Sequence, residues 1–159
     1  MIKRLLDQIV AVISAPASPT TDAAARDAAI RMATAVLMVD VARADHVFED
    51  SEFERVLQLV QSHFRLAPED AAELVSLASD KAEELTSAYE VTSILHQYLD
   101  ADEEARIVGL LWQVAYADGQ LDKYEDSLVL KISDLLHVSR GRVMRLKHDA
   151  AQEARQRSS

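Results

Sequence analysis

Three carboxylate side chains lie close together where an apolar, helix-like stretch of the sequence ends. Within residues 112–125, the apolar stretch ends at the turn pair Asp118-Gly119, and Asp122 and Glu125 follow this pair. Asp118 and Asp122 flank a tight loop, so their carboxylates can converge, while Glu125 lies one turn into the next helix and can point back toward them. Carboxylate oxygens are hard ligands that suit Ca²⁺, Mg²⁺ or Mn²⁺. The spacing is therefore compatible with a divalent-metal site.

A second copy of this stretch occurs earlier in the chain. Residues 41–52 align with it when 73 is added to each number, and eight aligned positions in and around the two stretches are identical. An internal repeat constrains the architecture, and here it predicts two related units of helix, acidic loop and helix. Asp45, Glu49 and Glu52 correspond to the three later acids. The candidate metal ligands are Asp45, Glu49, Glu52, Asp118, Asp122 and Glu125.

Helix capping is the alternative explanation for the same acids. Asp122 with Glu125 three positions later is a capping arrangement, and the helix dipole favours acids at a helix start. Capping explains Asp118 less well, because an acid at a helix C-terminus opposes the dipole. An EF-hand is excluded, because its loop requires Gly at position 6 and Glu at position 12, where a count from Asp118 meets Lys123 and Val129.

Other chemistry has little support in the sequence. The five histidines show no His-Glu-x-x-His spacing, and neither a Gly-rich phosphate loop nor a Gly-x-Ser-x-Gly nucleophile motif is present. His46 lies beside Asp45, but an ordinary loop histidine explains it more simply. The chain has no cysteine, which excludes disulfides and thiolate metal sites. We expect a protein without enzymatic activity.

The segments that must position these loops have a helical composition. The 159 residues include three Gly and three Pro, which favours helices over strands and turns. We expect an all-α, single-domain bundle of about seven or eight helices, with the apolar segments ending at Ala44 and Ala117 at its centre. The predicted helices cover about residues 2–14, 22–44, 50–64, 68–85, 86–99, 101–117 and 123–137, with a last helix after Ser139. The inward faces are expected to include Ala72, Val75, Leu77 and Ala78 in the fourth of these, and Val143, Met144 and Leu146 in the last.

Pro16 and Pro19 mark the clearest linker in the chain. They divide it into an N-terminal helix and linker at residues 1–19 and a helical domain at residues 20–159. The apolar residues of the first segment have helical spacing and are interrupted by polar ones, so we expect an amphipathic helix rather than a signal peptide. The sequence contains no run of 18 apolar residues, so no membrane span is predicted.

The charge of the chain is strongly acidic but unevenly distributed. The net charge is −10, which disfavours nucleic acid as a partner because phosphate backbones are repelled. From Val138 onward, however, there are six basic and two acidic side chains. This basic end is either a solvated terminal helix or lies against acidic surface, in this molecule or in a partner.

The two acidic stretches are similar to those of the TerB-like family, the tellurite-resistance-associated helical proteins of bacteria. The motifs are Val-Ala-Arg-Ala-Asp at residues 41–45 and Val-Ala-Tyr-Ala-Asp-Gly at residues 114–119, each followed by its two further acids. The first copy has His46 where the second has Gly119. The resemblance implies an all-helical fold, a cytoplasmic or inner-membrane-associated setting, and a role in metal sensing or chelation during chemical stress. The chain has no His-Pro-Asp tripeptide, so we expect no chaperone coupling of the J-domain type.

Two hypotheses of function follow. The first is a metal-binding stress-response module that uses both acidic loops, with Ca²⁺, Mg²⁺ or Mn²⁺ as the cofactor. The second is an interaction scaffold, whose acidic face docks a basic protein partner or the basic last helix of a second copy. A cytoplasmic location fits both hypotheses, and so does association with a membrane-bound complex.

Overall fold

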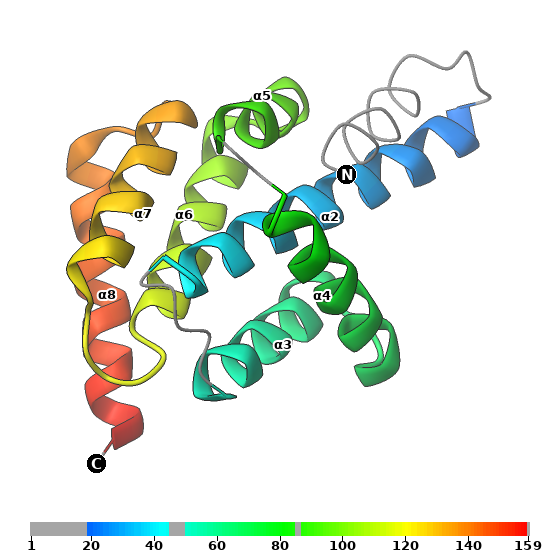
Figure 1. Cartoon of the computed structure of the whole chain (residues 1–159). Helices are drawn as coiled ribbons and strands as arrows, with labels where there is room; N and C mark the ends of the chain where they lie inside the picture. The colour runs from blue at the N-terminus through cyan, green and yellow to red at the C-terminus, as the bar shows by residue number, and fades with distance from the viewer. Residues whose placement is uncertain (1–18, 45–49, 85–86, 159) are drawn as a thin grey trace.

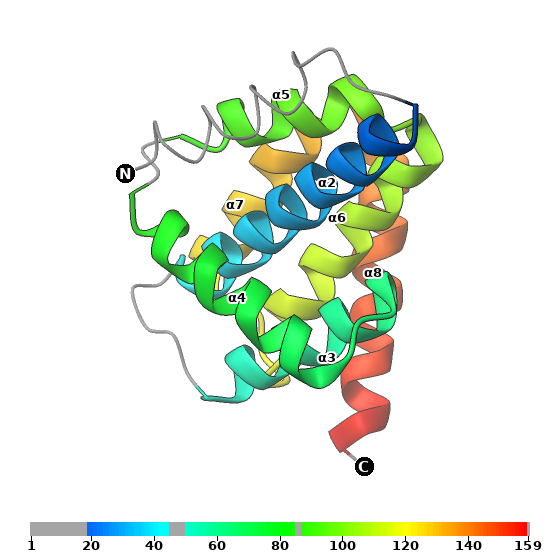
Figure 2. The ribbon, with the colours of Figure 1, turned by 90° about the vertical axis from the view of Figure 1, so that its right-hand side faces the viewer.

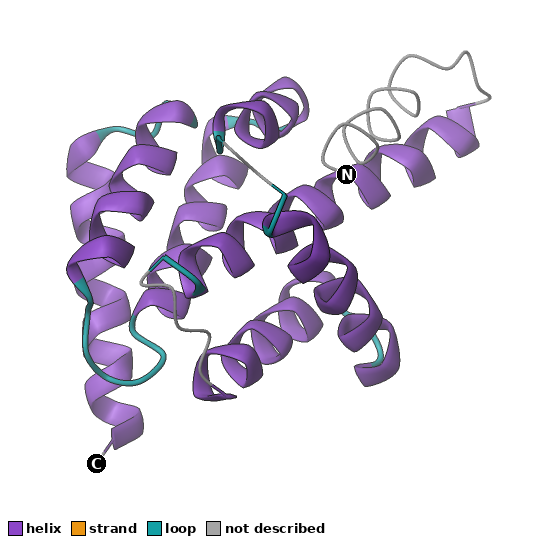
Figure 3. Ribbon diagram, in the orientation of Figure 1, coloured by secondary structure: helices purple, strands orange, loops and turns teal. Residues whose placement is uncertain are grey.

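The computed structural model describes residues 19–44, 50–84 and 87–158, and in this part of the chain it contains seven α-helices and no strand (Figures 1 and 3). The expectation of an all-α fold is therefore confirmed. The helices are α2 (Pro19–Ala42), α3 (Asp50–Phe64), α4 (Pro68–Ala82), α5 (Tyr89–Tyr98), α6 (Ala101–Ala115), α7 (Lys123–Leu135) and α8 (Arg140–Ser158). No described helix has both the length and the apolar composition that a membrane span needs.

Most helix boundaries agree closely with the sequence prediction. The largest differences are of three residues: α4 ends at Ala82 rather than near 85, α5 begins at Tyr89 rather than near 86, and α2 begins at Pro19 rather than near Asp22. Proline is tolerated in the first turn of a helix, where an unpaired N–H is normal. Asp100 and Glu103 form a complete capping box at the start of α6. The expected helix at residues 2–14 lies outside the described residues.

Helices α2 and α6 form the centre of the bundle and contact each other. α2 also packs against α3, α4 and α5, while α6 packs against α7 and α8, so the two central helices are covered from several sides (Figure 2). Their largest side chains, among them Leu37, Met38, Leu111 and Trp112, are fully buried. This confirms that the two apolar segments are the core of the protein.

The repeat seen in the sequence is also present in the structure. α2 and α6 end at Ala42 and Ala115, which are 73 residues apart, and α3 and α7 begin with the same separation. The buried positions of the second helix correspond one to one. They are Glu52, Val56, Leu59 and Val60 in α3, and Glu125, Val129, Ile132 and Ser133 in α7.

The repeated unit contains a third helix that sequence comparison did not reveal. A left-handed residue follows the end of both α3 and α7, namely Arg65 with φ 55° and His137 with φ 59°. Leu66 N–H then donates to Gln61 O and Val138 N–H to Ser133 O, each at 3.1 Å, as in a Schellman motif. α4 and α8 follow, and they pack on α2 and α6 respectively. Each unit therefore has three helices, and α5 lies between the units in the chain.

Two predicted inward faces are partly wrong. In α4 the buried residues are Ala71, Val75, Ala78 and Ala82, whereas Ala72 and Leu77 are exposed. In α8 Val143 is buried but Met144 is exposed. The buried stripe of α4 follows a spacing of 4, 3 and 4 residues from Ala71, which places its neighbours in water.

The basic helix α8 lies against acids of its own chain. Arg142 pairs with Asp102 at 3.0 Å, Arg140 with Asp134 at 3.4 Å, and the Lys147 ammonium with Asp126 at 2.7 Å. Both alternatives for this end of the chain hold in part, because these three side chains contact acids of the same molecule, whereas Arg145, Arg155 and Arg157 are exposed.

Candidate metal-binding loops

The loop between α6 and α7 turns sharply just after the first of its aspartates. Gly119 has φ 87°, a backbone conformation that side chains disfavour, and its N–H donates to Tyr116 O at 2.9 Å. Asp118 is exposed, and its Oδ1 accepts a hydrogen bond from the backbone N–H of Gln120 at 3.0 Å. The aspartate thus bonds to its own loop, which accounts for an acid at a position that the helix dipole disfavours.

Asp122 ends the loop and begins the next helix. It is the N-cap of α7, and its Oδ2 accepts from Tyr124 N–H at 2.8 Å and from Glu125 N–H at 3.3 Å. The capping explanation is therefore confirmed for Asp122. The other carboxylate oxygen, Oδ1, has no hydrogen bond from a described residue.

Glu52 and Glu125 occupy equivalent places in the first turns of α3 and α7, and both are buried, at 3% and 4% exposure. Burying a carboxylate is costly unless it is hydrogen-bonded or paired with positive charge. The N-terminal end of a helix, where the dipole is positive, is the least unfavourable place for one. The burial of both acids means that the repeat preserves a carboxylate inside the protein, next to each acidic loop.

The described residues contain no group of three or more His, Asp or Glu side chains already arranged to hold a metal. Of the six predicted ligands, Asp118, Asp122 and Glu125 come from one loop and the following turn, and Glu52 is buried at the start of α3. Asp45 and Glu49 lie outside the described residues. The second loop thus brings its three acids to one short segment, without forming a closed coordination shell.

Comparison with protein families shows which family the chain belongs to. A family model described as "Tellurite resistance protein TerB" matches residues 31–148. The chain belongs to the TerB family. The match includes both acidic loops and all of α3 to α7, so the TerB relationship covers the repeat as well as the fold. Comparisons with curated proteins and with solved structures gave no significant match.

Two charged residues near the loops of this TerB-family chain belong to no motif that the sequence reveals. Burial raises the pKa of Asp40, at the end of α2, although the charges of Arg43 and Lys131 oppose the shift. Arg55, one turn beyond Glu52, is largely buried, and burial lowers the pKa of its guanidinium. No sequence motif marks either position, because each shift depends on side chains from other helices.

Arg55 connects three helices of the TerB-family fold. Its guanidinium contacts the carboxylate of Glu153 in α8 at 2.5 Å and the side-chain oxygen of Gln113 in α6 at 3.2 Å. It also bonds to Gln58 within its own helix at 3.2 Å. These contacts hold the first turns of α3 against the second repeat unit.

Proposed function

We propose that this TerB-family protein is a non-enzymatic module that binds a divalent cation through its acidic loops. The ion is Ca²⁺, Mg²⁺ or Mn²⁺, and the setting is a cytoplasmic response to tellurite or related chemical stress. The observation that carries the proposal is that a loop amide holds one oxygen of Asp118, and the first amides of α7 hold one oxygen of Asp122. The second oxygen of each carboxylate has no hydrogen bond from a described residue and is available to a ligand.

Hydrogen bonds of this kind support metal binding because they orient carboxylates before the ion arrives. Buried Glu125 lies in the first turn of α7, beside the same loop. The proposal extends to Asp45, Glu49 and Glu52 through the repeat. Hard carboxylate ligands match Ca²⁺, Mg²⁺ and Mn²⁺ better than softer metals.

The test compares thermal unfolding in EDTA with unfolding in millimolar Ca²⁺, Mg²⁺ or Mn²⁺. An ion that binds only the folded protein, at 100 times its Kd, stabilises it by about 2.7 kcal/mol. For a domain of this length, that raises the Tm by roughly 5–10 °C. We expect Asp118→Asn and Glu125→Gln to abolish the metal-dependent increase.

A matched control separates the loop from a general effect of charge. Asp149→Asn removes one negative charge from an exposed position on α8, outside both loops, so it should leave the metal-dependent increase unchanged. Identical Tm values in EDTA and in all three metals would refute metal binding. An equal response from the Asp118 and Asp149 variants would show that the ions act only by screening.

The alternative function is a scaffold whose acidic surface docks a basic protein. Exposed acidic side chains away from α8 favour this function. They include Glu69, Asp70 and Glu73 at the start of α4. Docking through exposed charge weakens as ionic strength rises past about 0.15 M, where the Debye length is about 8 Å. A chelate site responds to EDTA and much less to NaCl, so a salt titration of complex formation distinguishes the two functions.

A further inference from the structure

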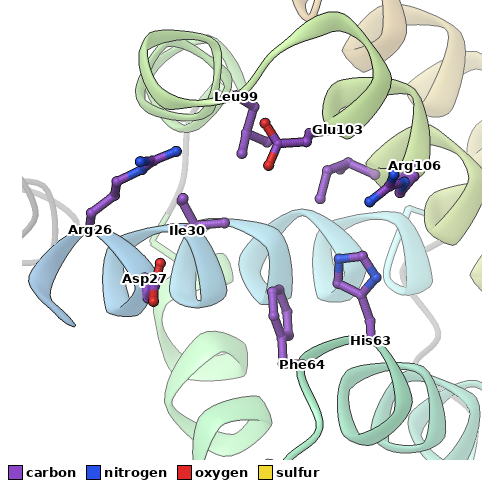
Figure 4. Close-up of a pocket in the computed structure, with 9 residues that line it drawn as sticks. Arg26, Asp27, Ile30, His63, Phe64, Leu99, Glu103 and Arg106 are labelled. Carbon is purple, nitrogen blue, oxygen red and sulfur yellow. The ribbon is translucent and has the colours of Figure 1, made fainter. Parts of the chain in front are cut away.

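A groove lies away from the acidic loops, between the first half of α2, the end of α3 and the start of α6 (Figure 4). It consists of two adjoining hollows of about 190 and 230 Å³. Both are lined by Asp27, Ile30, His63 and Phe64. Arg31 lies 11 positions before Ala42, where α2 ends next to the first acidic stretch, which corresponds to roughly 16 Å along a helix. The groove is thus separate from the proposed metal site.

The groove is basic although the chain as a whole is strongly acidic. Four arginines and a histidine line it against two acids, Asp27 and Glu103. The basic residues are Arg26, His63 and Arg106 in one hollow, with Arg31 and Arg65 added by the other. One oxygen of Glu103 already accepts a hydrogen bond from the Asp100 N–H, at 3.0 Å, in the capping box. The positive charge of the groove therefore exceeds its negative charge.

The arginines of the groove are not held by ion pairs within the described part of the chain. Arg26 donates to the backbone oxygen of Tyr98 at 3.1 Å, which holds it at one edge. Among the ion pairs of the described residues, none includes Arg31, Arg65 or Arg106. Their guanidinium groups consequently keep their donors for something outside the protein.

His63 and Arg106 face each other across the groove (Figure 4). Burial lowers the pKa of His63, and the positive charge of Arg106 lowers it further. Apolar side chains, namely Ile30, Phe64, Leu99 and Ile107, form the rest of the lining. A ligand that fits must combine an anionic group with a small apolar part.

We propose that this groove binds a small phosphorylated organic molecule. Guanidinium groups bind phosphate in a bidentate manner, and several of them suit a dianion better than a singly charged carboxylate. The apolar lining would cover the carbon part of the ligand. Each hollow is smaller than the roughly 300 Å³ at which typical drug-sized sites begin, so the ligand is a small phosphate monoester. The family match begins at residue 31 and includes His63, Arg65 and Arg106.

The test is calorimetric titration of the full chain with phenyl phosphate, benzoate and inorganic phosphate. We expect phenyl phosphate to bind at least tenfold more tightly than either of the others, because only it supplies both the dianion and the ring. Arg106→Gln should weaken phenyl phosphate binding at least tenfold, and so should Arg31→Gln. Arg145→Gln, an exposed arginine on α8, is the matched control and should leave the affinity unchanged.

Each other outcome overturns the proposal. Absence of phenyl phosphate binding at millimolar concentration would refute it, and so would equal weakening by the Arg106 and Arg145 variants. Tighter binding of benzoate would reassign the groove to carboxylates. Tighter, Arg106-dependent binding to phosphatidylcholine vesicles containing phosphatidic acid would replace the soluble ligand by a lipid headgroup. Asp118→Asn should leave phenyl phosphate binding intact, so the result is independent of the metal proposal.

Discussion

Asp118 and Asp122 are both loop aspartates, but their side chains bond to different parts of the backbone. Asp122 accepts the first amides of α7, whereas Asp118 accepts an amide within its own turn. The sequence spacing predicted that these acids would come close together and that Asp122 would cap a helix. It did not predict that Glu125 and Glu52 would be buried, because polar residues at a helix start are usually solvated. Their burial depends on the helices that pack against α3 and α7, and spacing along the chain does not show that packing.

Asp122→Ala should destabilise the protein by about 1 kcal/mol, because α7 loses its N-cap. The loss should be the same in EDTA and in metal, since capping does not require an ion. Chemical denaturation measures it, with Asp118→Asn in EDTA as the comparison, which should lie within about 0.5 kcal/mol of the parent chain. Equal effects of the two substitutions in EDTA would contradict the assignment of the cap to Asp122.

Asp40→Asn should stabilise the protein at neutral pH. Burial raises the pKa of Asp40 above 3.8 despite Arg43 and Lys131, so the folded state disfavours the charged form. The penalty is absent below pH 3.8, develops as the pH rises from 3.8 to the folded pKa, and is complete above the folded pKa. Denaturation of both proteins at pH 4 and pH 7 measures this difference. A variant that is less stable than the parent at pH 7 would show that the neighbouring charges outweigh burial.

At the scale of the helices, apolar periodicity and turn residues predicted the boundaries well. Pro68 at the first turn of α4 and Asp100 before α6 are local signals, and both agree with the structure. The inward face of α4 was less predictable, because alanine occurs on both its buried and exposed sides and carries little information about orientation. Contact with α2 decides which face of α4 is buried, and Ala72 and Leu77 lie on the exposed side.

Trp112 joins α6 to α8, and its replacement should weaken that contact. Its side chain is fully buried, its Nε1–H donates to Val143 O at 3.2 Å, and the Lys147 ammonium lies 5.2 Å from the ring. Trp112→Phe removes the donor and leaves unfilled volume, so we expect a loss of roughly 1–3 kcal/mol in free energy of unfolding. Met144→Ala, at an exposed position on α8, should cost less than about 0.5 kcal/mol. Similar losses from both would mean that α8 is not held through Trp112.

At the scale of the whole molecule, the sequence revealed two helices of a repeat that has three. α4 and α8 escaped detection because the separation changes from 73 to 72 residues at the left-handed residues Arg65 and His137. The basic groove was also undetectable, since its lining comes from positions between 26 and 107 that adjoin only after folding. Sequence patterns indicate which face of a single helix is buried. A site formed between helices can be recognised only once their packing is known.

The paired central helices should unfold together. Amides of residues 36–41 in α2 and 108–114 in α6 belong to one buried core, so their hydrogen exchange should require global unfolding. We therefore expect the same opening free energy in both segments, equal to the free energy of unfolding from denaturation. Markedly faster exchange in one segment would show that the two repeat units open independently.

The three-helix repeat has a consequence for the origin of the protein. A chain carrying one unit would expose the apolar face that α2 and α6 now present to each other, and an identical copy is the simplest way to cover it. Gene duplication and fusion, with α5 as the join, would convert such a homodimer interface into the interior of a single chain. After fusion, the two copies can diverge in sequence, as they have at His46, whose counterpart is Gly119.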